Sequence, residues 1–373
     1  MDHLSQGFFP FFKGRVALYA ILKAIGIKKG AEIILPGFTC VVVSNAIIYL
    51  GAKPVYVDID PGTFNIDVTK IEKEVTEKTA AIIAQNTFGL SSDLDPILEI
   101  ANKYKIKVIE DCAHGFGGTY KGQQNGTVAD AAFFSTQWSK PFSTGLGGFA
   151  VSSNSQIKAK IENECKSYSL PNITESIMLW GLLRSYDLLM RPAIYWPAIK
   201  AYRALSRLGI VTGSSSDDEL LSPQKPAGFE KRMPLFLQKR VRKEIERFSD
   251  NLKHRLWVVA RYDEIFDNMG LGKPYKPDYA LHTFLRYSFL VKDKKTFLRR
   301  AEESRIEAGD WFVSPLHPIE GDLSSWSYVK GSCPVAENVC GRIVNLPTHK
   351  RINAEQIHKV EKVLIKMKAQ GVL

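Results

Sequence analysis

Short apolar runs alternate with helical patterns through the first 150 residues, and this alternation limits the possible folds more than any other feature of the chain. Apolar residues recur at helical spacing in Arg15–Ile25, Cys40–Leu50 and Asp93–Tyr104. The runs typical of buried strands are Glu32–Leu35, Pro54–Val57, Ala80–Ala84, Lys107–Ile109, Ala131–Ser135 and Phe149–Ser152. Such strands, separated by helices, predict an α/β fold with a mostly parallel, mixed sheet flanked by helices. Ligands of these sheets bind at the carboxyl ends of the strands.

The second half of the chain has a different pattern. Arg232–Phe266 is typical of one or two long basic helices that connect two domains. A strand–helix pattern then covers Phe284–Val291 and Lys295–Ser304, and the amphipathic run Asn353–Lys368 predicts a terminal helix. We therefore expect a large domain over residues 1–250, with an insertion at about 172–219, and a smaller α+β domain over residues 251–373.

Composition narrows the class of protein. With 373 residues and a formal net charge of +11, the chain is long enough for two domains and favours anionic partners. Its basic residues are scattered and no nucleic-acid-binding signature occurs, so we expect anionic small-molecule substrates and no nucleic acid. The five cysteines form no Cys-x-x-Cys pair, which predicts reduced thiols and no metal site. We find neither a secretory signal nor an apolar run of membrane length and expect a cytoplasmic protein.

The first candidate for chemistry is Val108–His114, an apolar strand that ends in two acids, a small pair and a histidine. The carboxylate of Asp111 could face a cationic ring nitrogen, and His114, three residues further on, could reach the same ring. An aspartate is also a common helix cap at strand–helix junctions. On this segment alone, that ordinary structural role is the better explanation.

The second candidate is Phe134–Gly148, where Lys140 lies among hydroxyl and aromatic residues between an apolar strand and a glycine-rich turn. A lysine that forms a Schiff base needs such surroundings, because partial desolvation and nearby cations lower its pKa and free the amine. Ser135, Ser139 and Thr144 could donate to a phosphate, and the glycines allow close backbone approach. Taken alone, Lys140 would be explained as a surface lysine in a loop.

Together, the two segments resemble the pyridoxal-phosphate-dependent sugar aminotransferases of the DegT/DnrJ/StrS group, which have the type I (aspartate aminotransferase) fold. Further matches follow the group's order along nearly the whole chain: Gly14–Leu18, Ile33–Thr39, Gly51–Asp60, Thr63–Asp67, Phe88–Gly89, Gly228–Met233, Pro315–His317, Pro334–Glu337 and Asn345–His349. So many short matches in one order are far more specific than any one of them. The resemblance implies a large pyridoxal-phosphate-binding domain and a smaller C-terminal domain.

The resemblance also implies roles for individual residues. As catalytic residues, Lys140 would carry the cofactor as a Schiff base, Asp111 would pair with its pyridine nitrogen, and His114 would lie against its ring. The residues implied for cofactor binding are Gly14, Arg15, Val16, Thr39, Asp111, His114, Ser135 and Lys140. Those implied for substrate binding are His317 and Arg232. The group is mostly homodimeric, and both subunits build each active site.

Three residues depart from the pattern of the group. Arg15 stands where threonine or serine is usual, so its backbone N–H and its guanidinium would hold the cofactor phosphate. Glu230 stands where an asparagine usually reaches the partner's phosphate. Its carboxylate would repel that phosphate unless Arg15 or Arg232 neutralises the charge, which leaves its role open. Leu146 replaces the usual acid of the glycine-rich turn.

The resemblance implies an aminotransferase that moves an amino group to a keto group of a nucleotide-linked deoxysugar, for amino-sugar or cell-surface polysaccharide biosynthesis. Glutamate is the expected amino donor. One branch of the group has histidine at the lysine position and dehydrates sugars, and Lys140 argues against it. Another branch aminates keto-cyclitols, which no residue here excludes. A regulator or membrane-surface scaffold that has kept the fold without catalysis is a further alternative.

The segment 176–211 is rich in large apolar and aromatic residues and contains five basic residues and one acid. This composition is typical of a helix at a membrane interface, although Pro192 and Pro197 would divide it. One interpretation is a peripheral contact with the inner face of the membrane. The other, which we favour because apolar surface usually buries against protein, is a lid or a dimer contact.

Overall fold

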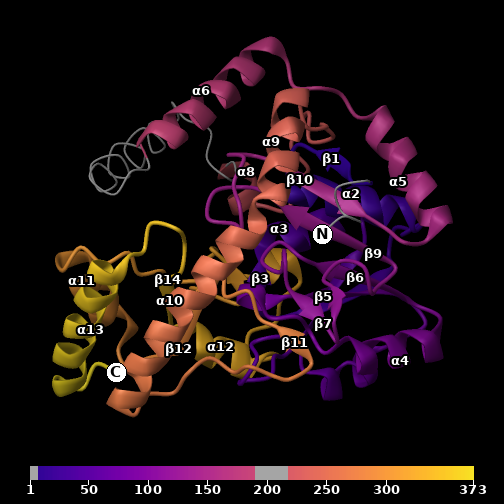
Figure 1. Cartoon of the computed structure of the whole chain (residues 1–373). Coiled ribbons are helices and arrows are strands. Elements are labelled where there is room, and N and C mark those ends of the chain that lie inside the picture. The colour runs from indigo at the N-terminus through magenta and orange to yellow at the C-terminus, as the bar shows by residue number, and fades with distance from the viewer. Residues whose placement is uncertain (1–6, 190–216) are drawn as a thin grey trace.

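Figure 1 shows the computed structural model of the chain, which describes residues 7–189 and 217–373. Its centre is a seven-stranded sheet in the order β1-β10-β9-β6-β5-β2-β4. The strands are β1 (Phe9–Phe11), β2 (Glu32–Pro36), β4 (Lys53–Val57), β5 (Thr79–Gln85), β6 (Lys107–Asp111), β9 (Ala131–Ser135) and β10 (Gly148–Val151). The strands from β9 to β4 run parallel, whereas β10 and β1 are antiparallel to their neighbours. The predicted mostly parallel, mixed sheet is therefore confirmed.

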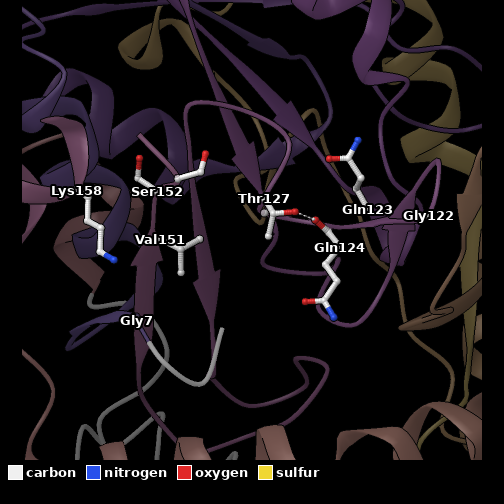
Figure 2. Close-up of a pocket in the computed structure, with 10 residues that line it drawn as sticks. Gly7, Gly122, Gln123, Gln124, Thr127, Val151, Ser152 and Lys158 are labelled. Atoms are coloured by element: carbon white, nitrogen blue, oxygen red, sulfur yellow. Dashed lines mark hydrogen bonds between the residues drawn. The ribbon is translucent and has the colours of Figure 1, made fainter. Parts of the chain in front are cut away.

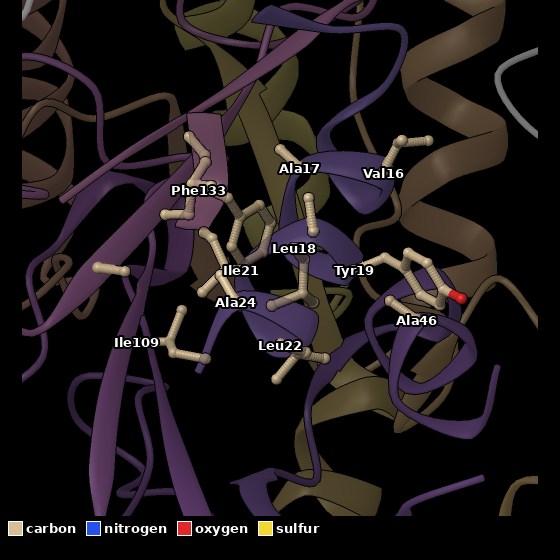
Figure 3. Close-up of a cluster of buried hydrophobic side chains, with 14 of the residues drawn as sticks. Val16, Ala17, Leu18, Tyr19, Ile21, Leu22, Ala24, Ala46, Ile109 and Phe133 are labelled. Carbon is tan, nitrogen blue, oxygen red and sulfur yellow. The ribbon is translucent and has the colours of Figure 1, made fainter. Parts of the chain in front are cut away.

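Helices flank this sheet and connect its strands: α2 (Gly14–Ala24), α3 (Val41–Ile48), α4 (Leu94–Tyr104) and α5 (Ser155–Ser167). Helix α2 lies almost wholly inside the core, where its apolar side chains pack with Ile109 of β6 and Phe133 of β9 (Figure 3). Each leucine or isoleucine that is fully buried in this way contributes about 1.5–3 kcal/mol. The packing holds the first residue of α2 close to the carboxyl end of β9.

A second core lies in the C-terminal part of the chain. It is built from α10 (Phe248–Met269), β12 (Arg286–Leu290), α11 (Lys294–Glu303), β14 (Ile343–Pro347) and α13 (Ala354–Ala369). Strands β12 and β14 pair antiparallel. Phe312 and several apolar residues as far as Ile343 pack instead with Phe38 of the large domain. The predicted domain limit at residue 250 falls at the beginning of α10, whose Phe248 belongs to a core cluster of the large domain.

The remaining elements are short or lie at the edge of the molecule. They are β3 (Thr39–Cys40), η1 (Val68–Lys70), η2 (Glu72–Glu74), η3 (Thr87–Gly89), β7 (Thr119–Tyr120), β8 (Gln123–Gln124), α6 (Ile173–Leu189), α8 (Asp217–Leu221), α9 (Leu235–Glu246), β11 (Ala280–Leu281), β13 (Leu316–His317), η4 (Ser324–Trp326) and α12 (Pro334–Arg342). Strands β3 and β13 pair in parallel, which joins the segment after β2 to the C-terminal part of the chain.

Helix α6 extends away from the sheet (Figure 1). Leu179 and Leu183 are buried in a core cluster of the large domain. In contrast, Ile173, Ile177 and Trp180 are 80%, 65% and 51% exposed, and we call these three residues the α6 stripe. Helix α6 covers the first part of the predicted segment 176–211, and residues 190–211 lie outside the described residues. In the described part of the chain, no helix is both long enough and apolar enough to cross a membrane.

Candidate active site

The residues with predicted chemistry meet at the carboxyl edge of the sheet, where parallel strands bring their last residues together. Asp111 ends β6, Ser135 ends β9, and Gly14 begins α2 beside them. They line a cavity of about 190 Å³, which we call the active-site pocket. Its other lining residues are Arg15, Cys40, Val42, Val43, Gln85, Ala113, His114, Phe133, Gln137, Trp138, Lys140, Trp311, Phe312, His317 and Pro318.

Asp111 is the buried acid of the active-site pocket. It is 4% exposed, and its Oδ1 accepts a hydrogen bond of 2.9 Å from the backbone N–H of Ala113. Burial raises the pKa of Asp111 to about 6, although the bond from Ala113 and the charge of Lys140 act in the opposite direction. Within the described ranges, no basic side chain forms an ion pair with this carboxylate. A cationic group of a ligand would therefore be stabilised here.

Lys140 lies on a turn after β9 that the chain closes with its own hydrogen bonds. The backbone N–H of Thr144 donates to the carbonyl of Thr136 at 2.8 Å, and the two threonine hydroxyls are 2.6 Å apart. The Lys140 side chain is partly buried, with Nζ 5.2 Å from the centre of the Trp311 ring. Burial is the main cause that lowers the pKa of this amine. A lowered pKa leaves more of the amine unprotonated, as a nucleophile requires.

His114 forms one wall of the pocket. Its ring is nearly parallel to that of Trp311, with an interplanar angle of 7° and a centroid distance of 5.3 Å. Its Nδ1 accepts a hydrogen bond of 3.3 Å from the backbone N–H of Phe88, so a neutral ring carries its proton on Nε2. Burial, assisted by the charge of Lys140, lowers the pKa of His114 well below its usual value. The ring is therefore neutral at physiological pH.

The N-terminus of α2 forms the other end of the pocket. No side chain caps this helix and its first turn has no acid, so its first N–H groups suit an anion such as a phosphate. A Cβ added to Gly14 would lie 3.0 Å from the Ser135 Cβ, which shows how closely the helix approaches that serine. Ser139 is exposed, and Thr144 donates to the Leu146 carbonyl at 3.0 Å. The structure thus assembles only Ser135 of the three hydroxyls predicted to face a phosphate.

The Arg15 side chain forms a buried ion pair with Glu219 of α8. Its Nη1 lies 2.7 Å from Glu219 Oε1, and the two side chains are 3% and 1% exposed. Glu219 also pairs with Lys13 at 3.4 Å, and its backbone carbonyl accepts a bond of 2.8 Å from Asn45 Nδ2. The predicted phosphate contact of Arg15 consequently rests on its backbone, since Glu219 already binds the guanidinium. Sequence reasoning missed Glu219 because no local pattern connects it to Arg15.

Three residues predicted for binding lie outside the pocket lining: Val16, Thr39 and Arg232. Val16 lies on α2 and is buried in the core. The hydroxyl of Thr39 donates to Gln85 Oε1 at 2.6 Å, and Gln85 lines the pocket, so Thr39 supports the wall from behind. Arg232 forms a backbone bridge with Phe11 of β1, at the edge of the sheet.

The other two departures from the group's pattern have local explanations. Glu230 pairs with Lys225 at 2.8 Å, so neither Arg15 nor Arg232, the two predicted partners, neutralises it. Leu146 is 2% exposed and packs in a core cluster of the large domain. An acid at that position would be buried among apolar side chains, which explains why this turn has a leucine.

The pocket also has an aromatic wall that the sequence did not predict. Trp311 and Phe312 line it beside His317, and the Arg286 guanidinium lies 5.2 Å from the centre of the Trp311 ring. The Asn345 amide holds the backbone of Trp311 through bonds of 3.1 and 3.2 Å. Burial lowers the pKa of His317 to about 4. The sequence signal that could have predicted this wall is the aromatic pair Trp311 and Phe312, just before the motif that contains His317.

A larger cavity of about 720 Å³ lies between the β7–β8 hairpin and α5 (Figure 2). Glycines, uncharged polar side chains such as Gln123, Gln124 and Thr127, and the aliphatic Val151 line it together with Lys158. None of the residues with predicted chemistry belongs to it. The active-site pocket is therefore the candidate site.

A partly buried lysine with a lowered pKa, a buried acid and an uncapped helix N-terminus meet in this pocket at the carboxyl edge of the sheet. These are groups that a pyridoxal-phosphate-dependent transferase needs to hold its cofactor. Comparison with known proteins narrows the class, because residues 12–364 match the DegT/DnrJ/EryC1/StrS aminotransferase family. The chain belongs to this family and is an aminotransferase, and the family implies pyridoxal phosphate as the cofactor.

Individual relatives agree with this assignment. The GDP-perosamine synthase of Caulobacter vibrioides is 41% identical over 352 residues, which are 93% of this chain and 82% of that protein. The UDP-2-acetamido-2-deoxy-3-oxo-D-glucuronate aminotransferase of Pseudomonas aeruginosa is 28% identical over 92% of this chain and 81% of that protein. A DegT DnrJ EryC1 StrS aminotransferase structure from Brucella abortus matches with a TM-score of 0.71 and 22% identity, over 96% of this chain and 85% of that one. The predicted family and fold are thereby confirmed.

Proposed function

We propose that this aminotransferase moves an amino group from glutamate to a keto group of a nucleotide-linked deoxysugar, for amino-sugar or cell-surface polysaccharide biosynthesis. The observation that carries the proposal is the placement of Lys140 and Asp111 in one pocket of a chain 41% identical to a GDP-perosamine synthase. The relative that acts on a UDP-linked keto sugar supports the same substrate class. The net charge of +11 suits a substrate that carries a pyrophosphate.

Lys140 and Asp111 perform the central steps. When bound, pyridoxal phosphate supplies an electron sink. The Asp111 carboxylate would keep a proton on the pyridine nitrogen, because a buried anion stabilises a cation placed next to it. The Lys140 amine would hold the cofactor covalently. When its amine is free, Lys140 Nζ would take a proton from the amino-bearing carbon and return a proton when the acceptor is aminated.

The other residues hold and orient the cofactor. The N-terminal turn of α2, from Gly14 to Val16, and the Ser135 hydroxyl would bind the phosphate, as a helix N-terminus suits an anion. His114 would lie against the ring and, being neutral, could donate from Nε2. Thr39 acts through Gln85, whose position in the pocket wall it fixes.

We infer that two copies of the chain form a homodimer in the cytoplasm. His317 lines its own pocket and would contact the sugar substrate there. Arg232 lies beside β1 and outside its own pocket, so its substrate contact would be made in the pocket of a partner subunit. The α6 stripe is a candidate for the dimer contact, and a peripheral membrane contact through the same face is the alternative.

Chemical trapping tests the role of Lys140. Borohydride treatment of the protein loaded with pyridoxal phosphate should fix the cofactor on Lys140, and peptide mass spectrometry would locate it. Lys140→Ala should abolish turnover while the far-ultraviolet circular dichroism stays unchanged. Lys158→Ala, which removes a lysine from the other cavity, is the matched control. Cofactor fixed on another lysine would overturn the proposal.

A substrate panel tests the reaction. The purified protein would receive glutamate with nucleotide-linked keto sugars, and separately with a keto-cyclitol, and products would be identified by mass spectrometry. We expect an amino sugar that is still linked to its nucleotide. Amination of the cyclitol alone would replace the proposed substrate class, and no product with any acceptor of the panel would contradict it.

A further inference from the structure

Arg255 is a buried arginine at the junction of the two domains. It lies on α10 between Phe248, in a core cluster of the large domain, and Val258, in the core of the C-terminal domain. Its exposed fraction is 6%, and it forms no ion pair with a carboxylate of residues 7–189 or 217–373. Burying a cation without an anion costs several kcal/mol unless hydrogen bonds compensate.

The hydrogen bonds of Arg255 reach both domains. Its Nη2 donates to the carbonyl of Pro141, the residue after Lys140, at 3.1 Å. Its Nη1 donates to the Leu285 carbonyl at 3.1 Å and to Thr348 Oγ1 at 3.0 Å. One rigid guanidinium therefore connects the Lys140 turn to two segments of the C-terminal domain.

Residues 284–285, whose carbonyls accept hydrogen bonds from Arg255, also support the pocket. Leu285 donates its backbone N–H to the Phe88 carbonyl at 2.8 Å, and the Phe88 N–H is the group that binds His114. The Thr348 hydroxyl donates to the Phe284 carbonyl at 2.6 Å. Arg255 thus ties the Lys140 turn to the same segment that positions the opposite wall of the pocket.

We propose that Arg255 is a positioning residue for Lys140: its guanidinium fixes the Lys140–Pro141 turn against residues 284–285 and keeps the lysine amine partly buried in the pocket. The inference rests on the proposed role of Lys140. An apolar side chain of similar volume would fill the same space without the cost of burying a charge. Stabilisation alone therefore does not account for an arginine here, whereas a four-way hydrogen-bonded clamp does.

The test measures the titration of the Lys140 amine, which reports its burial. The full-length chain without cofactor would be labelled briefly with an acylating reagent at a series of pH values, and the modification of Lys140 would be quantified by peptide mass spectrometry. In Arg255→Met the turn loosens and water reaches the amine, so we expect its apparent pKa to rise by about one unit. Arg261→Met, on the same helix but exposed and paired with Glu264, should leave the titration unchanged.

Arg255→Lys separates positioning from charge. It keeps the positive charge but cannot make all four bonds, so we expect the Lys140 titration to shift in the same direction as in Arg255→Met. Thr348→Val removes one acceptor without touching the Lys140 turn, and a smaller shift in that direction is expected. If Arg255→Met does not fold, the Lys140 titrations of Arg255→Lys and Thr348→Val test the inference.

Two results would overturn the inference. One is a lower unfolding temperature in Arg255→Met and Arg255→Lys with the wild-type Lys140 titration, which would make Arg255 a stabilising residue only. The other is a shift in Arg255→Met alone, which would assign the effect to charge. Neither result depends on turnover. The borohydride experiment on the wild type therefore reports separately whether Lys140 is the cofactor lysine.

Discussion

The Asp111 carboxylate carries an electrostatic cost that a bound cation would relieve. Burial raises its pKa to about 6, above the value in an unfolded chain. A carboxyl group whose pKa is higher in the folded state binds protons more tightly there. The folded chain without cofactor therefore loses stability as the pH rises from about 4 through about 6, by on the order of 3 kcal/mol.

Asp111→Asn should abolish this pH dependence. We expect the variant to have a higher free energy of unfolding than the wild type at pH 8, by up to about 3 kcal/mol, and a similar one at pH 4. Urea titrations of the cofactor-free chains at pH 4, 6 and 8 would measure the difference. The same variant should lose at least about a hundredfold in transamination rate, because the pyridine nitrogen loses its anion.

A matched control is Asp95→Asn, at an exposed acid whose pKa is lowered by its bond to Lys121. Loss of that acid should not raise stability at high pH. The same stability gap between wild type and Asp111→Asn at pH 4 and pH 8 would contradict the pKa of Asp111. Near-normal turnover would show that the cofactor ring lies elsewhere.

Candidate site residues could be predicted from the sequence where they lie together in one short motif. Lys140 and Asp111 each follow an apolar strand inside a short motif, so their position at the strand ends could be predicted. Glu219 could not, because its ion pair with Arg15 depends on tertiary packing between distant segments. Trp311 could not be assigned either, because its contact with His114 brings together two different parts of the chain.

At the scale of elements, one ion pair ties the short helix α8 to the N-terminus of α2. Both side chains of the Arg15–Glu219 pair are buried. Glu219→Gln would remove the carboxylate that pairs with the buried Arg15 guanidinium, and we expect a loss of about 3–5 kcal/mol in the free energy of unfolding. Chemical denaturation would measure it, with Glu264→Gln in the exposed Arg261 pair as a control that changes stability by less than about 1 kcal/mol. Equal losses in the free energy of unfolding for the two substitutions would show that burial does not strengthen the Arg15–Glu219 pair.

The exposed apolar face of α6 leads to a second prediction about a single helix. We expect a second copy of the chain to cover the α6 stripe, because apolar surface usually buries against protein. A triple variant, Ile173→Ser, Ile177→Ser and Trp180→Ser, should then shift the protein from dimer to monomer in light scattering. Val329→Ser, at an apolar residue 69% exposed elsewhere, should leave the dimer intact.

Vesicle sedimentation tests the alternative that α6 contacts a membrane. A wild-type protein that co-sediments with anionic vesicles in a salt-sensitive way would support the membrane alternative. The triple variant would then remain dimeric and stay in the supernatant. That pair of results would contradict the predicted dimer contact.

Most elements could be predicted because their apolar periodicity is local. The strands β2, β5 and β9 begin and end within about two residues of the predicted runs, as periodicity allows. The break between α9 and α10 was not located, because it falls at Arg247, which departs from helical geometry with φ −94° and ψ 1°. Neither glycine nor proline marks that position, so the sequence carries no signal for it.

At the scale of the whole molecule, the positions of Arg232 and Lys140 predict sites shared between subunits. If Arg232 acts in the partner's pocket, inactive Arg232→Ala and Lys140→Ala variants should restore activity when they are unfolded together and refolded as a mixture. An equal mixture would have intact residues in about a quarter of its sites, by random pairing of the subunits. Specific activity near a quarter of the wild-type value would confirm sharing. A mixture as inactive as its components would show that Arg232 does not act across the interface.

The sequence also predicted two domains, but not how the chain passes between them. The segment from Phe312 to Ile343 follows the first strand of the C-terminal core, yet its apolar residues pack with Phe38 and Phe88 of the large domain. Apolar periodicity identifies which face of a segment is buried, but not the surface that covers it. The packing of residues 312–343 on the large domain could therefore not be predicted.

Helix α10 has a consequence for how the chain unfolds. It begins in a core cluster of the large domain at Phe248 and ends in the C-terminal core at Met269, without interruption. Melting either end of α10 would remove part of the apolar surface on which one core depends and expose the other end to fraying. The two domains are therefore expected to unfold in one cooperative transition, and a chain cut at residue 250 would be left as a fragment without an intact partner for its core.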